Sequence, residues 1–422
     1  MDHFNIIDGA MHAEGVPLSI IADAVGTPVY VYSTATIERH ARVFAEAVSG
    51  CGNGEPLIAY AVKANPNGAV LATLARMGLG ADVVSIGEVK RALAAGIPPE
   101  KIIFSGVGKT APEMAEALEL GIGQFNLESE PEAEMLSAVA SGKAMVAAIA
   151  FRINPNVVAG THAKISTGSA ETKFGVAYDR ARDAFAMAAR LPGLKPQGVA
   201  VHIGSQLTSL EPLADAFAKI GALITELRAD GHDIVSADLG GGLGVPYDPS
   251  LALPPSPADY GAMVRKATQG WDVRLAFEPG RLIVANAGVL LSRVIRVKPS
   301  VTNQPFVIVD AAMNDLLRPS LYDAWHDIRA VTPSGERTTA NVVGPVCETG
   351  DTFASAREMD VVGPDELIVF ATAGAYAATM ASTYNSRALT PEVMVSGDRW
   401  AVVRERVPIE VLIAADKIPD WL

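Results

Sequence analysis

Residues 57–105 read LIAYAVKANPNGAVLATLARMGLGADVVSIGEVKRALAAGIPPEKIIFS, and this stretch contains the pattern that decides the fold. A short apolar strand leads into a polar turn, an Ala- and Leu-rich helix follows, and then the next strand begins. The pattern predicts strands at Leu57–Val62, Ala81–Ser85, Ile102–Ser105, Gln124–Leu127, Val146–Ile153, Gly198–His202, Ile234–Asp238 and Val273–Phe277. Helices are expected between them at Gly68–Met77, Gly87–Ala95, Ala111–Leu120, Pro131–Ala140 and Leu210–Ala229. Eight strands that alternate with helices indicate an α/β fold of the (β/α)8 TIM-barrel type.

The pattern changes after residues 278–281, and the rest of the chain predicts a mostly-β domain. Its Val- and Ile-rich strands are expected at Gly288–Val297, Pro305–Val309, Asp365–Phe370 and Pro391–Val407. The strand-like segment Pro28–Tyr32 precedes every barrel strand, so we expect it to join this second domain. The predicted domains are therefore residues 36–285 for the barrel, and 1–35 with 286–422 for the β-rich domain.

Composition excludes several classes of function. The 422 residues include 34 Lys and Arg against 47 Asp and Glu, a net charge of −13 that disfavours nucleic acid or an anionic membrane as partner. Cys51 and Cys347 are too few for a disulfide framework or a structural metal site, and they suit a reducing cytoplasm. The first residues resemble no signal peptide. The uncharged stretch 367–386 has too many Ser, Thr and Asn residues for a membrane span, so we expect a buried strand that runs into a polar loop.

In a (β/α)8 barrel the active site lies at the carboxyl ends of the strands. Ionisable residues and a glycine cluster follow the predicted strands there, at Lys63, Asp82, Arg152, Asn154, His202, Ser205, Gly240–Gly242, Glu278 and Arg281. This convergence predicts one chemically active rim.

Each of these residues has two interpretations. Lys63, at the mouth of an apolar strand, is either a partly desolvated amine suited to a Schiff base or a surface lysine paired with a carboxylate. Gly240–Gly242 either surround a phosphate with backbone N–H groups or form a tight turn that needs positive φ. Glu278 either binds a cofactor ring nitrogen, with Arg281 on a substrate carboxylate, or pairs with Arg281. His202 either stacks on a flat cofactor or is a satisfied core residue.

A lysine, a phosphate-binding turn, a ring-nitrogen acid and a stacking histidine together match pyridoxal 5′-phosphate (PLP). The motifs YAVKAN (60–65), HIGSQ (202–206), LGGGLG (239–244), EPGR (278–281) and CETGD (347–351) resemble the barrel-type PLP-dependent decarboxylases, in that family's order and over essentially the whole chain. The segment GTHAKISTG (160–168), which leads to KFG (173–175), is similar to the diaminopimelate decarboxylases within this family.

The resemblance implies a role for each matching residue. Lys63 would carry the cofactor, His202 would stack on its ring, and Glu278 would pair with the ring nitrogen. The phosphate would be held by Ser205, Gly240, Gly241, Gly242, Gly280 and Tyr376, and Arg281 would also contact the cofactor. The distal end of the substrate would be bound by Arg281, Arg318, Tyr322, Glu348 and Tyr376. Asp82, Glu88 and Arg152 would orient the lysine and the cofactor.

Cys347 resembles the family's proton donor, which is delivered from the second subunit of a homodimer; its other interpretation is an ordinary buried cysteine. Ala377 and Ala388 depart from the glycine and proline that are usual in the family, and they bear on the geometry of the Tyr376 loop.

The physical requirements of the reaction agree with this resemblance. A glutamate at the ring nitrogen makes the cofactor a strong electron sink, whereas a racemase of the same barrel family uses an arginine there. Two arginines suit a substrate with a distal carboxylate, which ornithine lacks. We therefore predict a cytoplasmic PLP-dependent carboxy-lyase that converts meso-2,6-diaminopimelate to L-lysine and CO2, the last step of lysine biosynthesis. The alternatives are a decarboxylase of ornithine or arginine and, more remotely, a non-catalytic PLP-binding barrel.

Overall fold

The computed structural model describes residues 2–158, 167–168, 172–301 and 304–422. The chain forms two compact units. One comprises residues 38–246 and 252–283, and the other comprises residues 1–37, 247–251 and 284–422.

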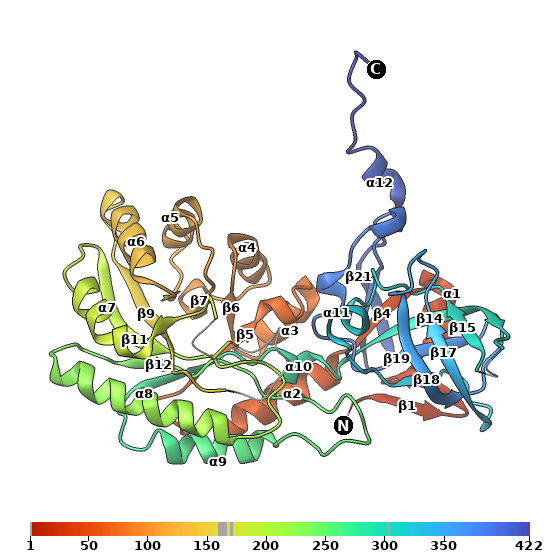
Figure 1. The fold of residues 1–422 in the computed structure, drawn as a ribbon, viewed down its shortest axis with the longest axis horizontal. Coiled ribbons are helices and arrows are strands. Elements are labelled where there is room, and N and C mark those ends of the chain that lie inside the picture. The colour runs from red at the N-terminus through yellow and green to blue at the C-terminus, as the bar shows by residue number, and fades with distance from the viewer. Residues whose placement is uncertain (1, 159–166, 169–171, 302–303) are drawn as a thin grey trace. The chain divides into compact units, whose positions relative to one another are not determined.

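The first unit is a closed barrel of parallel strands surrounded by helices (Figure 1). Its strands, in spatial order, are β9 (Ala147–Asn154), β11 (Leu194–Ala200), β12 (Ser236–Asp238), β13 (Arg274–Phe277), β5 (Leu57–Ala61), β6 (Gly80–Val83), β7 (Ile102–Phe104) and β8 (Gln124–Leu127). The pairing of β8 with β9 closes the ring, and the short strand β10 (Val176–Ala177) extends β9 outside it. The predicted barrel fold is confirmed.

Helices surround the strands. They are α2 (Thr34–Val48), α3 (Gly68–Arg76), α4 (Ile86–Ala94), α5 (Ala111–Glu119), α6 (Glu130–Gly142), α7 (Ala181–Ala188), α8 (Glu211–Ala229), α9 (Pro257–Ala267) and α10 (Arg281–Val284). Of these, α3, α4, α5 and α9 begin at capping side chains. Thr110 and Glu113 form a capping box that starts α5, and Ser85 caps α4 by accepting from the N–H of Glu88. The caps at Ser85 and Thr110 fix where the turns after β6 and β7 end.

The second unit is rich in strands, and both ends of the chain contribute to it. Its main sheet runs β18 (Thr352–Asp360), β17 (Arg337–Val343), β15 (Phe306–Val309), β14 (Gly288–Lys298), β4 (Val29–Ser33), β20 (Glu392–Ser396) and β21 (Arg399–Arg404). The strand β19 (Leu367–Phe370) also pairs with β14, and β16 (Ile328–Ala330) pairs with β19. Smaller elements are the sheet of β1 (Phe4–Ile7), β2 (Ala10–Ala13) and β3 (Val16–Pro17), and the helices α1 (Leu18–Val25), α11 (Arg318–Tyr322) and α12 (Ile409–Ile413).

The N-terminal strand β4 lies between β14 and β20, so the prediction that it joins the C-terminal domain is confirmed. Buried valines and leucines hold it there, among them Val29, Val31, Leu291 and Val393. The expected single strand Pro391–Val407 is wrong, because β20 and β21 form a hairpin that turns at Gly397, where φ is 64°. Every helix among the described residues is too short or too polar to cross a lipid bilayer.

Candidate active site

A cavity of about 400 Å³ opens at the carboxyl ends of the barrel strands. Four predicted residues line it: Lys63, Arg152, His202 and Glu278. Three further polar residues, Ser105, Asn126 and Asp238, line it as well and were not predicted. Four residues that the barrel rule brings to one rim therefore lie around one cavity, and the structure adds further polar residues to its lining.

Lys63 follows β5 and reaches the carboxylate of Asp82, which lies in the neighbouring strand β6. The Nζ atom lies 2.6 Å from Oδ2 of Asp82, whose side chain is fully buried while that of Lys63 is 37% exposed. The other carboxylate oxygen, Oδ1 of Asp82, is buried without a hydrogen-bond partner among the described residues. Lys63 therefore pairs with a carboxylate, as one interpretation expects, and it also stands in the cavity wall, where its role as a Schiff-base amine remains a prediction. As a nucleophile, this amine first has to lose a proton.

Glu88 supports the same corner of the site from α4. Its Oε2 accepts a hydrogen bond from the backbone N–H of Val84, a residue of the cavity wall, at 2.8 Å. Burial raises the pKa of Glu88, and the charge of nearby Asp82 acts in the same direction. Glu88 thus fixes the turn that follows Asp82.

His202 lies two residues beyond β11 and is held as a neutral ring. Its Nδ1 accepts a hydrogen bond from the backbone N–H of Gly241 at 3.2 Å, which leaves the ring proton on Nε2. Burial lowers the pKa of His202 well below its usual value, and the positive charges of Arg152 and Lys63 lower it further. An uncharged ring on the cavity wall is suited to stacking on a flat ligand.

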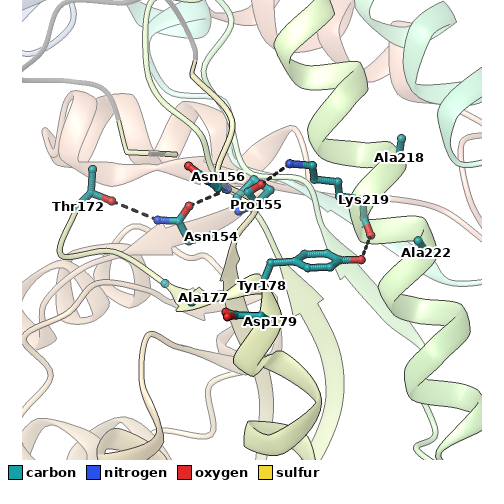
Figure 2. Close-up of a pocket in the computed structure, with 11 residues that line it drawn as sticks. Asn154, Pro155, Asn156, Thr172, Ala177, Tyr178, Asp179, Ala218, Lys219 and Ala222 are labelled. Atoms are coloured by element: carbon teal, nitrogen blue, oxygen red, sulfur yellow. Dashed lines mark hydrogen bonds between the residues drawn. The ribbon is translucent and has the colours of Figure 1, made fainter. Parts of the chain in front are cut away.

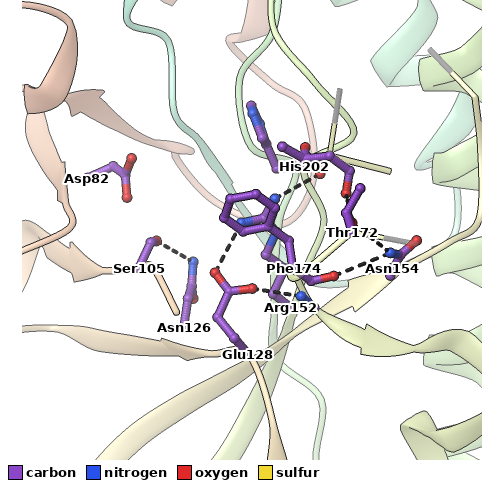
Figure 3. Close-up of polar contacts among 12 residues, drawn as sticks. Asp82, Ser105, Asn126, Glu128, Arg152, Asn154, Thr172, Phe174 and His202 are labelled. Atoms are coloured by element: carbon purple, nitrogen blue, oxygen red, sulfur yellow. Dashed lines mark hydrogen bonds and ion pairs between the residues drawn. The ribbon is translucent and has the colours of Figure 1, made fainter. Parts of the chain in front are cut away.

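Arg152 ties the loops around His202 together (Figure 3). Its guanidinium pairs with Glu128 at 3.1 Å, donates to the backbone carbonyl of His202 at 3.1 Å, and lies 4.8 Å from the ring centroid of Phe174. Because three groups from different loops meet at one guanidinium, Arg152 acts here as a structural connector. Most of the motif 160–168 lies outside the described residues, but the Oγ1 of Thr167 donates to the same carbonyl of His202 at 2.9 Å.

Glu278 lies in a buried polar network instead of standing alone. Asp238 and Glu278 stand at the ends of adjacent strands, and the side-chain amide of Asn126 reaches both carboxyl groups. Asn126 donates to Asp238 at 2.9 Å, and Ser105 donates to Glu278 at 3.3 Å. Burial raises the pKa of Glu278 well above its usual value, and the negative charges of Asp238 and Asp82 add to the effect.

The glycine-rich turn after β12 has a steric explanation of its own. Gly240 and Gly242 have φ of 65° and 115°, and a Cβ on Gly241 would lie 2.2 Å from the carbonyl oxygen of Glu278. Nearby, the Nη2 of Arg281 donates to the Oγ of Ser205 at 3.0 Å. The turn therefore requires glycine with or without a ligand, and its phosphate-binding role remains a prediction.

Gly280, directly before Arg281, belongs to the barrel unit, and the other predicted residues belong to the β-rich unit, where two segments carry most of them. Helix α11 begins at Arg318 and ends at Tyr322, and residues 344–351 carry Cys347 and Glu348. Ser320 of α11 donates to the carbonyl of Gly350 at 2.6 Å, which ties the two segments together. Cys347 is exposed, so its interpretation as a buried cysteine is wrong.

Asp351, the last residue of the CETGD motif, organises this loop. Its Oδ1 and Oδ2 accept hydrogen bonds from the backbone N–H groups of Met313 and Val346, each at 2.6 Å. Gly344 leaves room for it, since a Cβ there would lie 2.3 Å from Oδ2 of Asp351. The carboxylate thus fixes the backbone immediately before Cys347.

Arg318 is oriented by aromatic neighbours. Its Nε donates to Nε2 of His326 at 3.3 Å, and its guanidinium lies 4.9 Å from the ring centroid of Tyr247. Tyr376, in the loop after β19, has a left-handed φ of 53°, and Thr372 nearby has a φ of 55°. Such φ values are costly for these residue types and mark the loop as strained.

A second cavity, of about 810 Å³, lies beside α8, and Figure 2 shows its lining. The Nζ of Lys219 donates to the carbonyl of Pro155 at 2.7 Å, and the hydroxyl of Tyr178 donates to the carbonyl of Lys219 at 3.2 Å. The amine of Lys219 and the hydroxyl of Tyr178 are thus engaged with the cavity's own walls. The smaller cavity at the barrel rim is the candidate active site.

The family model for the pyridoxal-dependent decarboxylase, pyridoxal binding domain, matches residues 34–285. Diaminopimelate decarboxylase from Zymomonas mobilis is 55% identical over 419 residues, which are 99% of each chain, and the enzyme of the same name from Vibrio cholerae is 48% identical over 421 residues and also 99% of each chain. This chain belongs to the diaminopimelate decarboxylase family. The predicted family and PLP cofactor are confirmed.

Solved structures of diaminopimelate decarboxylases share the fold over nearly the whole chain. The Helicobacter pylori enzyme in complex with L-lysine has a TM-score of 0.90 at 42% identity and covers 94% of this chain and 98% of its own. The M. jannaschii enzyme, also in complex with L-lysine, has a TM-score of 0.94 at 35% identity and covers 100% and 99%. The family's barrel and β-rich domain are therefore both present here.

Proposed function

We propose that this protein decarboxylates meso-2,6-diaminopimelate to L-lysine and CO2 with PLP as cofactor. The observation that carries the proposal is that Lys63, His202 and Glu278 line one cavity at the barrel rim, in a chain that matches diaminopimelate decarboxylases from end to end. The proposal therefore keeps the predicted PLP-dependent carboxy-lyase and the predicted substrate, meso-2,6-diaminopimelate.

The residues of the cavity fit this cofactor. Lys63 offers an amine for the cofactor aldehyde, His202 a neutral imidazole for its ring face, and Glu278 an acid for its ring nitrogen. The Oδ1 of Asp82, which has no hydrogen-bond partner in the part of the chain that the structure describes, is available to a ligand or a water molecule beside the lysine. When bound, PLP supplies a conjugated ring that accepts the electron pair left by departing CO2.

In this proposal the barrel residues bind and orient the cofactor. Lys63 would hold it through Nζ, with Asp82 directing the amine and Glu88 and Arg152 fixing the surrounding turns. Ser205, Gly240–Gly242, Gly280 and Tyr376 would bind the phosphate, and Arg281 would contact both cofactor and substrate.

Residues of the β-rich unit would bind the distal end of the substrate and supply the proton donor. Arg318 and Arg281 suit the distal carboxylate, Glu348 suits the distal ammonium, and Tyr322 and Tyr376 would line the same pocket. Cys347 would hold a proton at Sγ and deliver it to the substrate carbon that lost CO2. We place the domain boundaries at residues 35/36 and 285/286. Residues 1–35 and 286–422 would then contribute to the site and to a dimer interface.

We further propose a homodimer with shared sites in the cytoplasm, where the exposed thiol of Cys347 would stay reduced. Mixing inactive Lys63→Ala and Cys347→Ala variants tests the dimer, because a mixed dimer regains one intact site. Absence of any rescue would argue against shared sites.

The decisive experiment for the function is product analysis with meso-diaminopimelate, ornithine and arginine as separate substrates. We expect L-lysine and CO2 in equal amounts from meso-diaminopimelate. Release of CO2 from ornithine or arginine alone would refute the proposed substrate.

A further inference from the structure

The carboxyl groups of Asp238 and Glu278 form a buried pair at the base of the cavity. Asp238 ends β12 and is 2% exposed, and Glu278 follows β13 and is 9% exposed. One amide nitrogen reaches both of them, because Nδ2 of Asn126 lies 2.9 Å from Oδ2 of Asp238 and 3.5 Å from Oε1 of Glu278, and the two carboxyl groups are close enough to share a proton. Two buried carboxyl groups in contact do not both ionise, because their charges repel in a medium of low polarity. The pair therefore holds one proton.

The surrounding donors place that proton on Glu278. The Oδ1 of Asp238 accepts from the backbone N–H of Gly240 at 2.9 Å, and its Oδ2 accepts from the Nδ2 of Asn126 at 2.9 Å. The contacts that Oε1 of Glu278 receives from the described residues are longer, 3.3 Å from Ser105 and 3.5 Å from Asn126. Good donors stabilise a carboxylate, so Asp238 is the ionised member of the pair.

The orientation of Asn126 is itself fixed. The Nε2 of Gln124, two residues earlier on β8, donates to the Oδ1 of Asn126 at 2.8 Å. The amide nitrogen of Asn126 is consequently turned toward Asp238, Ser105 and Glu278. The other charged groups that act on the pair are Asp82, which raises the pKa values of both acids, and Lys63, which opposes this effect at Glu278.

We propose that Asp238 is a positioning residue that keeps the shared proton on Glu278, ready for the ring nitrogen of the cofactor. This inference rests on the proposed function. With the cofactor bound, this proton would pass from the Glu278 carboxyl oxygen to the lone pair of the ring nitrogen. Glu278 becomes the carboxylate partner of the cationic ring, and Asp238 stays ionised behind it, so its charge favours retention of the proton by the Glu278–ring pair.

The cofactor-free protein provides a test that does not depend on activity. Infrared spectra of protein labelled with 13C in the glutamate side-chain carboxyl group should contain a carboxylic acid band at pH 7 that is absent from a Glu278→Gln variant. Labelling aspartate instead should give no such band from Asp238. A band that shifts with aspartate labelling and disappears in Asp238→Asn protein would overturn the assignment of the proton.

The Asp238→Asn variant then tests the role of the charge. We expect the Glu278 acid band to disappear at a pH at least one unit lower than in wild type, and kcat to fall about tenfold or more with KM changed less than twofold. Asp315→Asn, which alters an aspartate buried to the same 2% in the other unit, is the control for general damage and should leave the band unchanged.

An unchanged acid band and an unchanged kcat in Asp238→Asn protein would refute the proposal. If that variant does not fold, Asn126→Ala removes one donor to Asp238 and should lower the pH at which the Glu278 band is lost; no shift there would also refute it. If wild type shows the band but no activity on meso-diaminopimelate, the proposed function fails while the proton assignment stands.

Discussion

A buried lysine outside the predicted site offers the sharpest stability test. Lys109 follows β7 and its side chain is fully buried; its Nζ lies 2.7 Å from Glu132 of α6 and donates to the backbone carbonyl of Asn126 at 2.9 Å. The same nitrogen lies 5.6 Å from the ring centroid of Phe104. Lys109 thus fastens the turn of residues 106–108, which lines the cavity, to β8 and α6.

Lys109→Met should destabilise the barrel by about 3–5 kcal/mol, because it leaves Glu132 buried with no opposite charge. Burial already raises the pKa of Glu132, and Lys109 is the largest influence that lowers it, so the variant raises it further. When the pKa of a carboxyl group is higher in the folded state than in the unfolded state, ionisation of that group at higher pH lowers the free energy of unfolding. The loss of unfolding free energy in Lys109→Met should therefore be smallest near the ordinary pKa of glutamate. It should grow by up to about 1.4 kcal/mol per pH unit as the pH rises toward the raised pKa of Glu132.

Denaturant unfolding of the cofactor-free protein between pH 5 and pH 8 measures this deficit. Lys143→Met is the matched control, because Lys143 pairs with Glu119 at the surface, with 29% and 60% of the side chains exposed, and should cost less than about 1 kcal/mol. The double variant Lys109→Met, Glu132→Leu should recover most of the loss. A Lys109→Met protein that is as stable as the control, or whose deficit is the same at every pH, would refute the reasoning.

Three further predictions concern the site. Lys63→Ala should lose both the visible absorbance of lysine-bound cofactor and all activity above the reaction without enzyme, and full activity would contradict its role. Asp351→Asn should cost about 1–3 kcal/mol in unfolding free energy and lower kcat, since the carboxylate that fixes the backbone before Cys347 loses its charge; an unchanged kcat would argue against Cys347 as proton donor. Arg318→Met should raise KM for meso-diaminopimelate roughly ten- to hundredfold with a smaller effect on kcat, as expected for loss of a charged hydrogen bond, whereas a change confined to kcat would place Arg318 elsewhere in the reaction.

The barrel can be predicted from local sequence because each strand and helix has its own periodicity. The boundaries are harder to predict: β11 begins at Leu194, four residues before the predicted Gly198, since Lys195 and Pro196 do not resemble a barrel strand. In the β-rich unit β17 and β18 are not predicted, because residues such as Arg337, Thr338 and Thr339 give an exposed strand little apolar signal.

The sequence predicts only those residues of the candidate site that stand at the carboxyl ends of barrel strands. Lys63, His202 and Glu278 follow barrel strands, and the rule that barrel strands end at one rim is enough to place them together. Asp238 offers a similar signal, a carboxylate at the end of an apolar strand, but the glycines that follow it are the more conspicuous feature of that strand end. The sequence indicates no role for Asn126, because the function of an amide within a strand depends on hydrogen-bond partners that the sequence does not show.

No equivalent rule covers the β-rich unit, where Cys347, Glu348 and Arg318 are identified by resemblance alone. What holds them is a set of contacts between segments distant in sequence, such as Asp351 with Met313, and contacts of this kind follow from the packing of strands. The chemistry of a strand end is local and can be predicted from the chain. The groups that set its protonation and geometry are long-range, so the three-dimensional arrangement is needed to assign roles to Asp238, Lys109 and Asp351.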